Sequence, residues 1–289
     1  MACRWARRLE RADRALGWPL SRLCFQGPES ELTLTANTQP AIVTVSIATL
    51  AAIREALPAL PPPAFAAGHS LGEYSALVAA GALSLEDAVR LVHVRGKAMQ
   101  DAVPAGEGAM AALMGGDAAA VAALCRDAAA DGSVAPANFN APGQVVIAGT
   151  KAAVERAAAL AAERKLKAIP LKVSAPFHCT LMAPAAERMQ GELSAIAFSP
   201  LSFPVISNVD AQPNADPARV AALLVRQIDG AVRWQQSIER MAAQGVERAL
   251  EIGPGKVLAG LVKRIDKRIA VHSVSDPEGA GQVAAFLGA

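Results

Sequence analysis

The stretch Ala64–Val78, which reads A-F-A-A-G-H-S-L-G-E-Y-S-A-L-V, decides the fold of this chain. A short uncharged run ends at Gly68-His69-Ser70-Leu71-Gly72, and a helix-compatible pattern follows it. This matches G-x-S-x-G between a strand and a helix, the setting in which a serine nucleophile is held in a sharp turn. We expect both glycines to let the two backbone segments pass closely. The alternative is a turn whose serine only caps the next helix.

The composition excludes several classes of protein. The chain has 289 residues, of which 53% are hydrophobic and 19% charged, enough for one large domain or two smaller ones. A net charge of +2 implies no strong field for nucleic acid. The spacing of the four cysteines suggests neither a metal knuckle nor a disulfide framework, so we expect a reducing cytoplasm. These cysteines are Cys3, Cys24, Cys125 and Cys179.

No membrane span or targeting segment is predicted. The segment Leu32–Ile53 is uncharged, but its apolar part, Ala41–Ile53, is too short to cross a bilayer. The segment Met1–Leu16 is rich in arginine and lacks the apolar region of a secretory signal. Glu10 and Asp13 argue against a transit peptide. We therefore expect a surface helix at this end of the chain.

Two helices flank the Ser70 stretch. Asn37-Thr38-Gln39-Pro40 predicts a helix start, with a capping residue and a proline in the first turn. Ser84-Leu85-Glu86-Asp87 predicts the start of a second helix, which runs to about Ala102. The spacing of its apolar residues places Arg95 on or beside the buried stripe. A buried guanidinium needs an anionic partner, either a structural Asp or Glu or the carboxylate of a substrate.

The segment 106–174 has the pattern of a small inserted domain. Its predicted order is strand, helix, two strands, helix and strand, which is the split βαβ or ferredoxin-like pattern. The predicted elements are Ala109–Met114, Asp117–Ala130, Ser133–Asn140, Gln144–Gly149, Lys151–Lys165 and Ala168–Val173. We expect the domains to be 106–174 and, around it, a large domain of 1–105 with 175–289.

Strands and helices alternate through the rest of the chain, so the large domain is predicted to be α/β with a mostly parallel sheet. Gly253-Pro254-Gly255-Lys256 is not a phosphate-binding loop and predicts a tight turn between a strand and a helix. The expected elements are Pro184–Ile196, Pro204–Asn208, Pro217–Ile228, Trp234–Gln244, Ala249–Ile252, Lys256–Ile265 and Ile269–Val274.

A serine nucleophile needs a base, most often histidine, and the chain has four. His178 follows a strand and a loop after Ser70, whereas strand alternation or helix position turns His69, His93 and His272 elsewhere. By elimination His178 is the predicted base, and a buried structural histidine is the alternative. No acidic residue sits in a strand-end loop just before His178. This weakens a hydrolase triad and favours a Ser–His pair oriented by a neutral carbonyl.

Six stretches together resemble the malonyl-CoA:acyl carrier protein transacylase family. They occur in the family's order and cover most of the chain from about Leu16. They are Gly68-His69-Ser70-Leu71-Gly72-Glu73-Tyr74-Ser75-Ala76, Arg95-Gly96-Lys97-Ala98-Met99-Gln100, Asn138–Gly149, Ala175-Pro176-Phe177-His178, Ser207-Asn208-Val209-Asp210 and Glu251-Ile252-Gly253-Pro254-Gly255-Lys256.

The resemblance implies a hydrolase-like large domain with a ferredoxin-like insert, and a two-step transfer. Ser70 would take the malonyl group from malonyl-CoA and pass it to the phosphopantetheine thiol of acyl carrier protein, in fatty acid synthesis. His178 would act as base and acid, and the backbone carbonyl of Gln227 would orient it. Arg95 would bind the malonyl carboxylate, and the Leu71 N–H would be an oxyanion donor. No cofactor, metal, nucleic acid or membrane would be needed, and we expect a monomer.

The family opens with a buried strand and a G-Q-G-S-Q loop, which supplies the second oxyanion N–H, and this sequence contains no such segment. Losing one donor typically costs about a hundred- to a thousand-fold in rate. We therefore expect weak or no activity from the 289-residue chain, restored by adding that segment. The alternatives are a serine esterase or thioesterase, and a truncated, inactive homologue that still binds the carrier protein. Lysines at 165, 167 and 172 and the basic run 263–268 could meet an acidic partner or simply face solvent.

Overall fold

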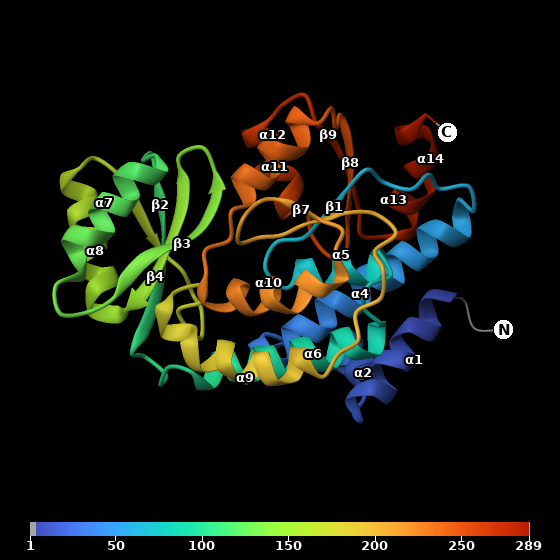
Figure 1. The fold of residues 1–289 in the computed structure, drawn as a ribbon, viewed down its shortest axis with the longest axis horizontal. Helices are drawn as coiled ribbons and strands as arrows, with labels where there is room; N and C mark the ends of the chain where they lie inside the picture. The colour runs from blue at the N-terminus through green and yellow to red at the C-terminus, as the bar shows by residue number, and fades with distance from the viewer. Residues whose placement is uncertain (1–3, 289) are drawn as a thin grey trace.

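The computed structural model describes residues 4–288, so Cys3 and the outermost ends of the predicted large domain lie outside it. A four-stranded sheet with its helices α7 and α8 stands at one end of the molecule, and the remaining helices and short strands form the rest (Figure 1). The helices before residue 106 are α1 (Arg4–Leu16), α2 (Leu20–Gln26), α3 (Glu29–Leu32), α4 (Thr35–Ala56), α5 (Gly72–Ala79) and α6 (Leu85–Asp101). Helix α1 lies where a surface helix is expected at the start of the chain. Helix α6 starts where Ser84-Leu85-Glu86-Asp87 predicts, and the Ser84 side chain accepts from the Asp87 N–H.

The predicted helix start at Asn37 is wrong, because α4 begins at Thr35. The Asn37 and Thr38 side chains donate backwards, to carbonyls of the preceding short helix and its last turn, at Glu31 and Leu32. These two residues therefore satisfy the end of α3 and do not cap α4. Sequence spacing alone does not show whether an Asn-Thr pair caps the helix that follows or bonds to the helix that precedes it.

Pro40 lies inside α4 and ties this helix to α6. Proline has no N–H, so the carbonyl four residues earlier, at Ala36, loses its partner within the helix. The ring Nδ1 of His93 on α6 lies 2.8 Å from that carbonyl oxygen and donates to it. Next to it, a Cβ on Gly96 would stand 2.5 Å from the Thr35 oxygen, so only glycine lets the helices meet this closely. The two helices are thus locked together near Arg95.

The four-stranded sheet has the order β3-β4-β2-β5 with every pair antiparallel, which is the ferredoxin-like arrangement. Its elements follow the predicted sequence of strands and helices. They are β2 (Gly108–Met114), α7 (Ala118–Ala129), β3 (Val134–Ala141), β4 (Gln144–Thr150), α8 (Lys151–Glu163) and β5 (Lys167–Pro170). The last strand ends at Pro170, short of the predicted Val173.

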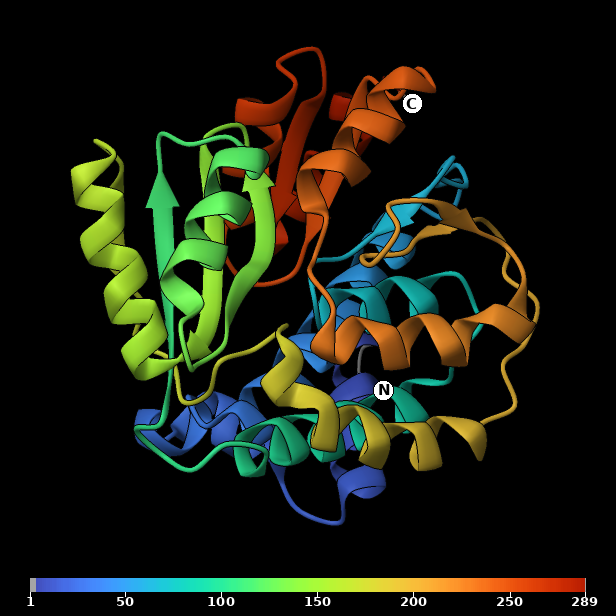
Figure 2. The same cartoon turned by 60° about the vertical axis from the view of Figure 1, so that its left-hand side comes forward.

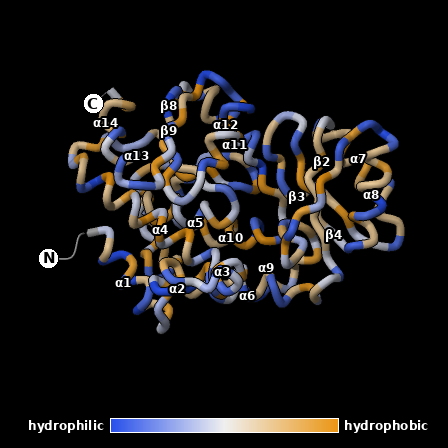
Figure 3. The backbone as a smooth tube through the Cα atoms, turned by 180° about the vertical axis from the view of Figure 1, so that it is seen from behind, coloured by the Kyte–Doolittle hydropathy of each residue, from blue (hydrophilic) through white to orange (hydrophobic). Residues whose placement is uncertain are grey.

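The two faces of this sheet pack against different parts of the chain. Helices α7 and α8 cover one face, where Leu113, Val121 and Ile147 are fully buried (Figure 2). The other face holds Met110 and Ala112, and it packs against Cys179. Hydrophobic segments run through these strands while hydrophilic residues mark the loops around them (Figure 3). The sheet therefore supports the loop that carries His178, the residue before Cys179.

The strands outside this sheet are short. Strand β1 (Ala66–Ala67) pairs parallel with β6 (Val205–Ile206), which pairs antiparallel with β7 (Pro213–Asn214). Strand β8 (Arg248–Ile252) pairs parallel with β9 (Ala270–Val274). The remaining helices are η1 (Thr180–Met182), α9 (Ala183–Ser194), α10 (Pro217–Asp229), α11 (Trp234–Ala243), α12 (Val257–Ile265), α13 (Pro277–Gly281) and α14 (Val283–Leu287). Parallel pairs thus outnumber antiparallel ones here, and these strands form two sheets separate from the four-stranded one.

Helix α4 is the one helix among the described residues that is long and apolar enough to span a membrane by length and composition. It packs against α1, α5 and α6, and 56% of its apolar window is buried inside the protein. A core helix satisfies the same length criterion, so this is weak support for a membrane span. Its buried residues include Gln39, whose side chain reaches the site described next.

Candidate active site

Ser70 stands in a strained turn between β1 and α5, with a backbone φ of 53°. Non-glycine residues rarely adopt this left-handed conformation, and it is concentrated at functional sites. A Cβ on Gly68 would lie 1.9 Å from the Gly72 oxygen, so the close passage of backbone requires glycine at 68. At Gly72 a Cβ would meet no atom within 4 Å. The expectation that both glycines relieve crowding is therefore wrong for Gly72, whose neighbours leave open space.

Ser70 and His178 meet in the structure. The serine Oγ lies 2.7 Å from His178 Nε2. On the far side of the ring, Nδ1 lies 2.8 Å from the backbone oxygen of Gln227 and donates its proton to it. That bond leaves the Nε2 lone pair free to accept the serine proton. Burial, reinforced by the charge of Arg95, lowers the pKa of His178 to about 3, so the ring is neutral at physiological pH.

Arg95 is 1% exposed and points at the same serine. Its Nη2 donates to Ser70 Oγ at 3.0 Å and to the side-chain oxygen of Gln227 at 2.9 Å. Its Nη1 donates to the side-chain oxygen of Gln39 at 2.6 Å. All three acceptors are neutral, and among residues 4–288 no carboxylate lies within ion-pair distance of Arg95. A buried cation held only by neutral oxygens is suited to bind an anionic ligand.

Gln227 is fully buried and touches every part of this cluster. Its backbone oxygen accepts from His178, and its side-chain oxygen accepts from Arg95. Its side-chain nitrogen donates to the Ser70 backbone oxygen at 2.9 Å and to Glu73 Oε2 at 2.8 Å. The family resemblance implies only the backbone contact, and a side-chain amide gives no periodic signal in a helix such as α10.

Asn208, which follows β6, braces the turn from the opposite side. Its Oδ1 accepts from the Ser70 N–H at 2.7 Å, and its Nδ2 donates to the Gly68 oxygen at 2.7 Å. Its own N–H donates to Glu73 Oε2 at 3.0 Å. Sequence reasoning gives no role to Asn208, Glu73 or Gln39. The position of Asn208 directly after a buried strand is the one signal that could single it out.

The backbone N–H of Leu71 lies at the start of α5, directly after the serine. Among the hydrogen bonds of residues 4–288, none uses this N–H. A free N–H at a helix start is suited to stabilise negative charge on an oxygen. The geometry therefore leaves Leu71 available for the role that the resemblance implies.

The other histidines have their own partners. His69 Nε2 lies 2.9 Å from Asn140 Oδ1, and His272 Nε2 lies 2.8 Å from the Gly279 oxygen. His93 bonds to Ala36 as described above. None of the three bonds to Ser70, whereas His178 does.

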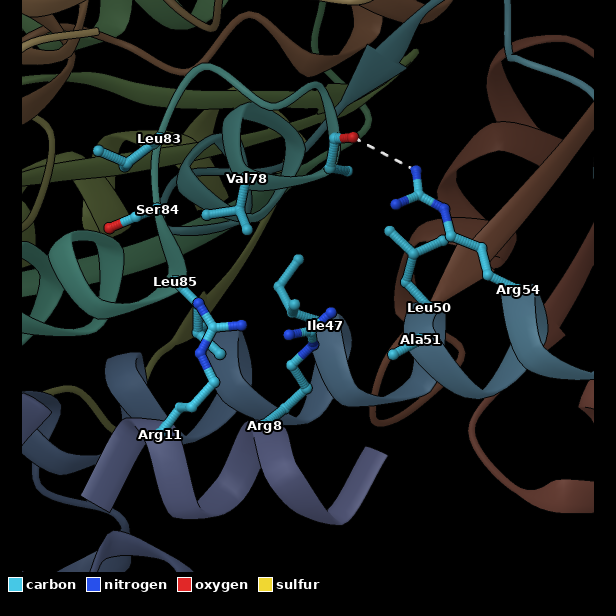
Figure 4. A pocket seen from close by; sticks show the side chains of 11 residues that line it. Arg8, Arg11, Ile47, Leu50, Ala51, Arg54, Val78, Leu83, Ser84 and Leu85 are labelled. Carbon is cyan, nitrogen blue, oxygen red and sulfur yellow. Dashed lines mark hydrogen bonds between the residues drawn. The ribbon is translucent and has the colours of Figure 1, made fainter. Parts of the chain in front are cut away.

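Residues 4–288 hold no cluster of histidine, cysteine and acidic side chains suited to a metal ion. A hollow of about 270 Å³ lies away from Ser70, between α1, α4 and the segment joining α5 to α6 (Figure 4). Arg8, Arg11 and Arg54 line it. Arg11 is paired with Glu86 at 2.5 Å, and Arg54 donates to the Ala79 oxygen at 3.4 Å. It shares no residue with the Ser70 cluster.

Comparison with known proteins gives one consistent family. Residues 2–283 match the acyl transferase domain family. A malonyl CoA-acyl carrier protein transacylase from Salmonella typhimurium is 50% identical over 267 residues, which cover 92% of this chain and 86% of the relative. The structure of an acyl-carrier-protein S-malonyltransferase from Burkholderia pseudomallei superposes with a TM-score of 0.94 at 45% identity, covering 97% of this chain and 91% of the other. A malonyl-transacylase solved in complex with a type II PKS acyl-carrier protein gives a TM-score of 0.94 at 43% identity, covering 99% and 91%.

Proposed function

Because this chain belongs to the acyl transferase domain family, we propose that Ser70 is its nucleophile and His178 its general base. The chain is an acyltransferase that moves the malonyl group of malonyl-CoA to acyl carrier protein. The 2.7 Å contact between Ser70 Oγ and His178 Nε2 is the observation that carries the residue assignment. Serine is a weak nucleophile until an adjacent base takes its proton.

The first half of the reaction acylates the serine. Ser70 Oγ attacks the thioester carbonyl of malonyl-CoA while its proton moves to His178 Nε2. The negative oxygen of the tetrahedral intermediate is stabilised by the Leu71 N–H at the start of α5. When the intermediate collapses, the carbon–sulfur bond breaks, and the departing thiolate of coenzyme A takes the proton from His178. The product is a malonyl ester on Ser70.

The second half returns His178 to its starting state. The phosphopantetheine thiol of the carrier protein gives its proton to His178 Nε2, and the thiolate attacks the ester carbonyl. The ester carbon–oxygen bond then breaks, and Ser70 Oγ recovers the proton from His178. Gln227 keeps the imidazole oriented in both halves, since its backbone oxygen holds Nδ1 at 2.8 Å.

Arg95 gives the site its preference for an acyl group that ends in a carboxylate. Its Nη2 lies 3.0 Å from the nucleophile, so an acyl group on Ser70 would be within reach of the guanidinium. A malonyl carboxylate would provide the anionic partner that the cluster of neutral acceptors does not. Fork-shaped pairing of guanidinium and carboxylate supplies both strength and orientation.

Mass spectrometry of the intact protein after mixing with malonyl-CoA tests this assignment. We expect a malonyl adduct on the parent, its disappearance in Ser70→Ala, and its loss on adding holo acyl carrier protein. An adduct that persists in Ser70→Ala would overturn the choice of nucleophile. Free malonate without an adduct would favour an esterase or thioesterase, and carrier binding without transfer would favour a binding homologue.

The pathway, compartment and oligomeric state belong to the same proposal. We assign the malonyl transfer to fatty acid synthesis in the cytoplasm by a monomer. The thiols of Cys24, Cys125 and Cys179 are free, which suits a reducing compartment. Transfer rates to carrier proteins of fatty acid and of polyketide synthesis would separate the two pathways. Light scattering after size-exclusion chromatography would report the oligomeric state.

A further inference from the structure

Glu73 is a buried carboxylate to which the proposed reaction gives no role. It is 3% exposed and lies in the first turn of α5, three residues after the nucleophile. Its Oε2 accepts two hydrogen bonds, from the Asn208 N–H at 3.0 Å and from the Gln227 side chain at 2.8 Å. Those two partners come from different elements, the end of β6 and helix α10. Glu73 therefore connects the segment after β6 with helix α10, beside the turn that holds Ser70.

The contact between Glu73 and Gln227 is compatible with only one orientation of the Gln227 amide. A carboxylate only accepts, so the Gln227 end that meets Glu73 must be the nitrogen. The oxygen of the same amide is then turned to Arg95, whose Nη2 donates to it at 2.9 Å. The Ser70 backbone oxygen accepts from the same nitrogen at 2.9 Å, so Glu73 and Ser70 hold this orientation of the amide together. Glu73 thus helps to hold the acceptor that keeps Arg95 beside Ser70.

The charges of Arg95 and Glu73 determine how this region responds when a second anion binds. Arg95 and Glu73 are the cation and the anion buried within this cluster, and the negative charge of Glu73 favours the charged form of Arg95. A malonyl carboxylate bound to Arg95 would bring a second negative charge into the same buried region. Two buried anions that share one cation repel each other, and the usual relief is protonation of one of them.

We propose that Glu73 is a positioning residue that balances the charge of Arg95 across the Gln227 amide while the site is empty, and that it takes up one proton from solvent when the malonyl carboxylate binds to Arg95. This inference rests on the proposed function of Ser70 and Arg95. The proton would sit on Oε1, so that Oε2 keeps accepting from Asn208 and Gln227. Departure of the malonyl group on the carrier protein releases the proton again.

The surroundings of Glu73 bring its pKa close to neutral pH. Burial raises the pKa of Glu73 to about 7, although the bonds from Gln227 and Asn208 and the charge of Arg95 act in the opposite direction. Two other ionisable groups face it. Asp210, in the loop after β6, raises the pKa of Glu73 further by its negative charge, and burial raises the pKa of Tyr74 to about 12, so this phenol stays neutral.

The proposal predicts how malonyl-CoA binding depends on pH. As the pH falls through 7, Glu73 becomes protonated and no longer repels the malonyl carboxylate at Arg95, so the malonyl carboxylate binds more tightly. If binding raises the pKa of Glu73 by about one unit, half-saturation for malonyl-CoA is about tenfold lower at acidic than at basic pH. Acetyl-CoA has no carboxylate and would show no such dependence.

The experiment measures how fast Ser70 is acylated at a series of malonyl-CoA concentrations, by rapid quench and intact mass, between about pH 6 and pH 8.5, a range that brackets the Glu73 titration. In the parent we expect the half-saturating concentration to rise about tenfold with pH. Glu73→Gln can still accept at one oxygen but has no charge, so its half-saturation should be low and independent of pH. The matched control is Glu239→Gln, which removes an exposed carboxylate on α11 and should follow the parent.

A Glu73→Leu variant, which cannot accept hydrogen bonds, should lower the maximal acylation rate at every pH, since Gln227 loses one of its two acceptors and the Asn208 N–H loses its partner. A pH profile of Glu73→Gln identical to that of the parent would overturn the proton uptake. A parent-like maximal rate in Glu73→Leu would overturn the positioning role. If the parent forms no adduct on Ser70 at any pH, the proposed function itself fails, and that outcome is distinct from both.

Discussion

Replacing Arg95 by alanine should change which acyl group the site accepts more than it changes the chemistry at Ser70. The guanidinium is 1% exposed and donates to three neutral oxygens, at 2.6, 2.9 and 3.0 Å. In Arg95→Ala the carboxylate of a malonyl group would enter this buried region without a cation. Removing one partner of a buried, hydrogen-bonded charge pair costs about 2–5 kcal/mol. This corresponds to roughly a 30- to 5,000-fold fall in kcat/KM for malonyl-CoA.

Acetyl-CoA provides the internal reference, because its acyl group carries no charge. For this donor the variant loses only the contact to Ser70 Oγ and leaves two amide oxygens without their donor. The ratio of kcat/KM values for malonyl- and acetyl-CoA should therefore fall by about the factor given above. Arg95→Lys should lie between, since it keeps the charge but loses the planar fork.

A surface arginine separates this effect from a general loss of positive charge. Arg188 on α9 is exposed and pairs with Glu192 at 2.6 Å, so Arg188→Ala should leave the malonyl to acetyl ratio unchanged. Circular dichroism at the assay temperature checks that Arg95→Ala is folded. A folded Arg95→Ala protein that still prefers malonyl-CoA by the parent ratio would refute the reasoning, because another group would then have to bind the carboxylate.

Three further predictions concern the turn and the base. Gly68→Ala places a Cβ 1.9 Å from the Gly72 oxygen, so we expect a lower Tm in calorimetry and little remaining activity; a parent-like Tm would contradict the close passage. Asn208→Ala leaves the Ser70 N–H and the Gly68 oxygen unpaired, and we expect a loss of about 1–3 kcal/mol of unfolding free energy in urea, together with slower acylation. Burial lowers the pKa of His178 to about 3. As the pH drops from 6.5 toward 3, this histidine binds a proton in the unfolded chain but not in the folded one, so the free energy of unfolding should fall. His178→Gln should flatten that part of the profile of urea midpoint against pH.

Local rules account for the elements that the sequence predicts well. The alternation of strands and helices in 106–174 follows from turn residues and apolar spacing, and all six elements form there. Ser70 and His178 are recognisable because the G-x-S-x-G spacing has a steric cause and because few histidines compete. The start of α4 is misjudged because Asn37 and Thr38 satisfy carbonyls of another helix. That choice depends on a tertiary position that no short stretch encodes.

The polar contacts beneath the serine are beyond sequence reasoning for a different reason. Gln39, Glu73 and Gln227 converge from α4, α5 and α10 and lie far apart in the chain. Each is a polar residue on a helix, where the default expectation is exposure to solvent. Only the folded chain reveals that their hydrogen-bonding groups complete one another around Arg95.

The uncharged carbonyl behind His178 has a consequence for the lifetime of the ester on Ser70. A carboxylate in that place would strengthen the imidazole as a base, whereas the Gln227 oxygen carries no net charge. A weak base removes the proton of a thiol, whose pKa is about 8.5, much more readily than that of water. The Ser70 hydroxyl differs from water because Arg95 Nη2 donates to its oxygen at 3.0 Å, which eases its deprotonation. We therefore expect the ester on Ser70 to react slowly with water and rapidly with a thiol. We expect the isolated ester to outlive its reaction with a thiol by orders of magnitude, and an ester that decays in buffer as fast as with a thiol present would argue against this.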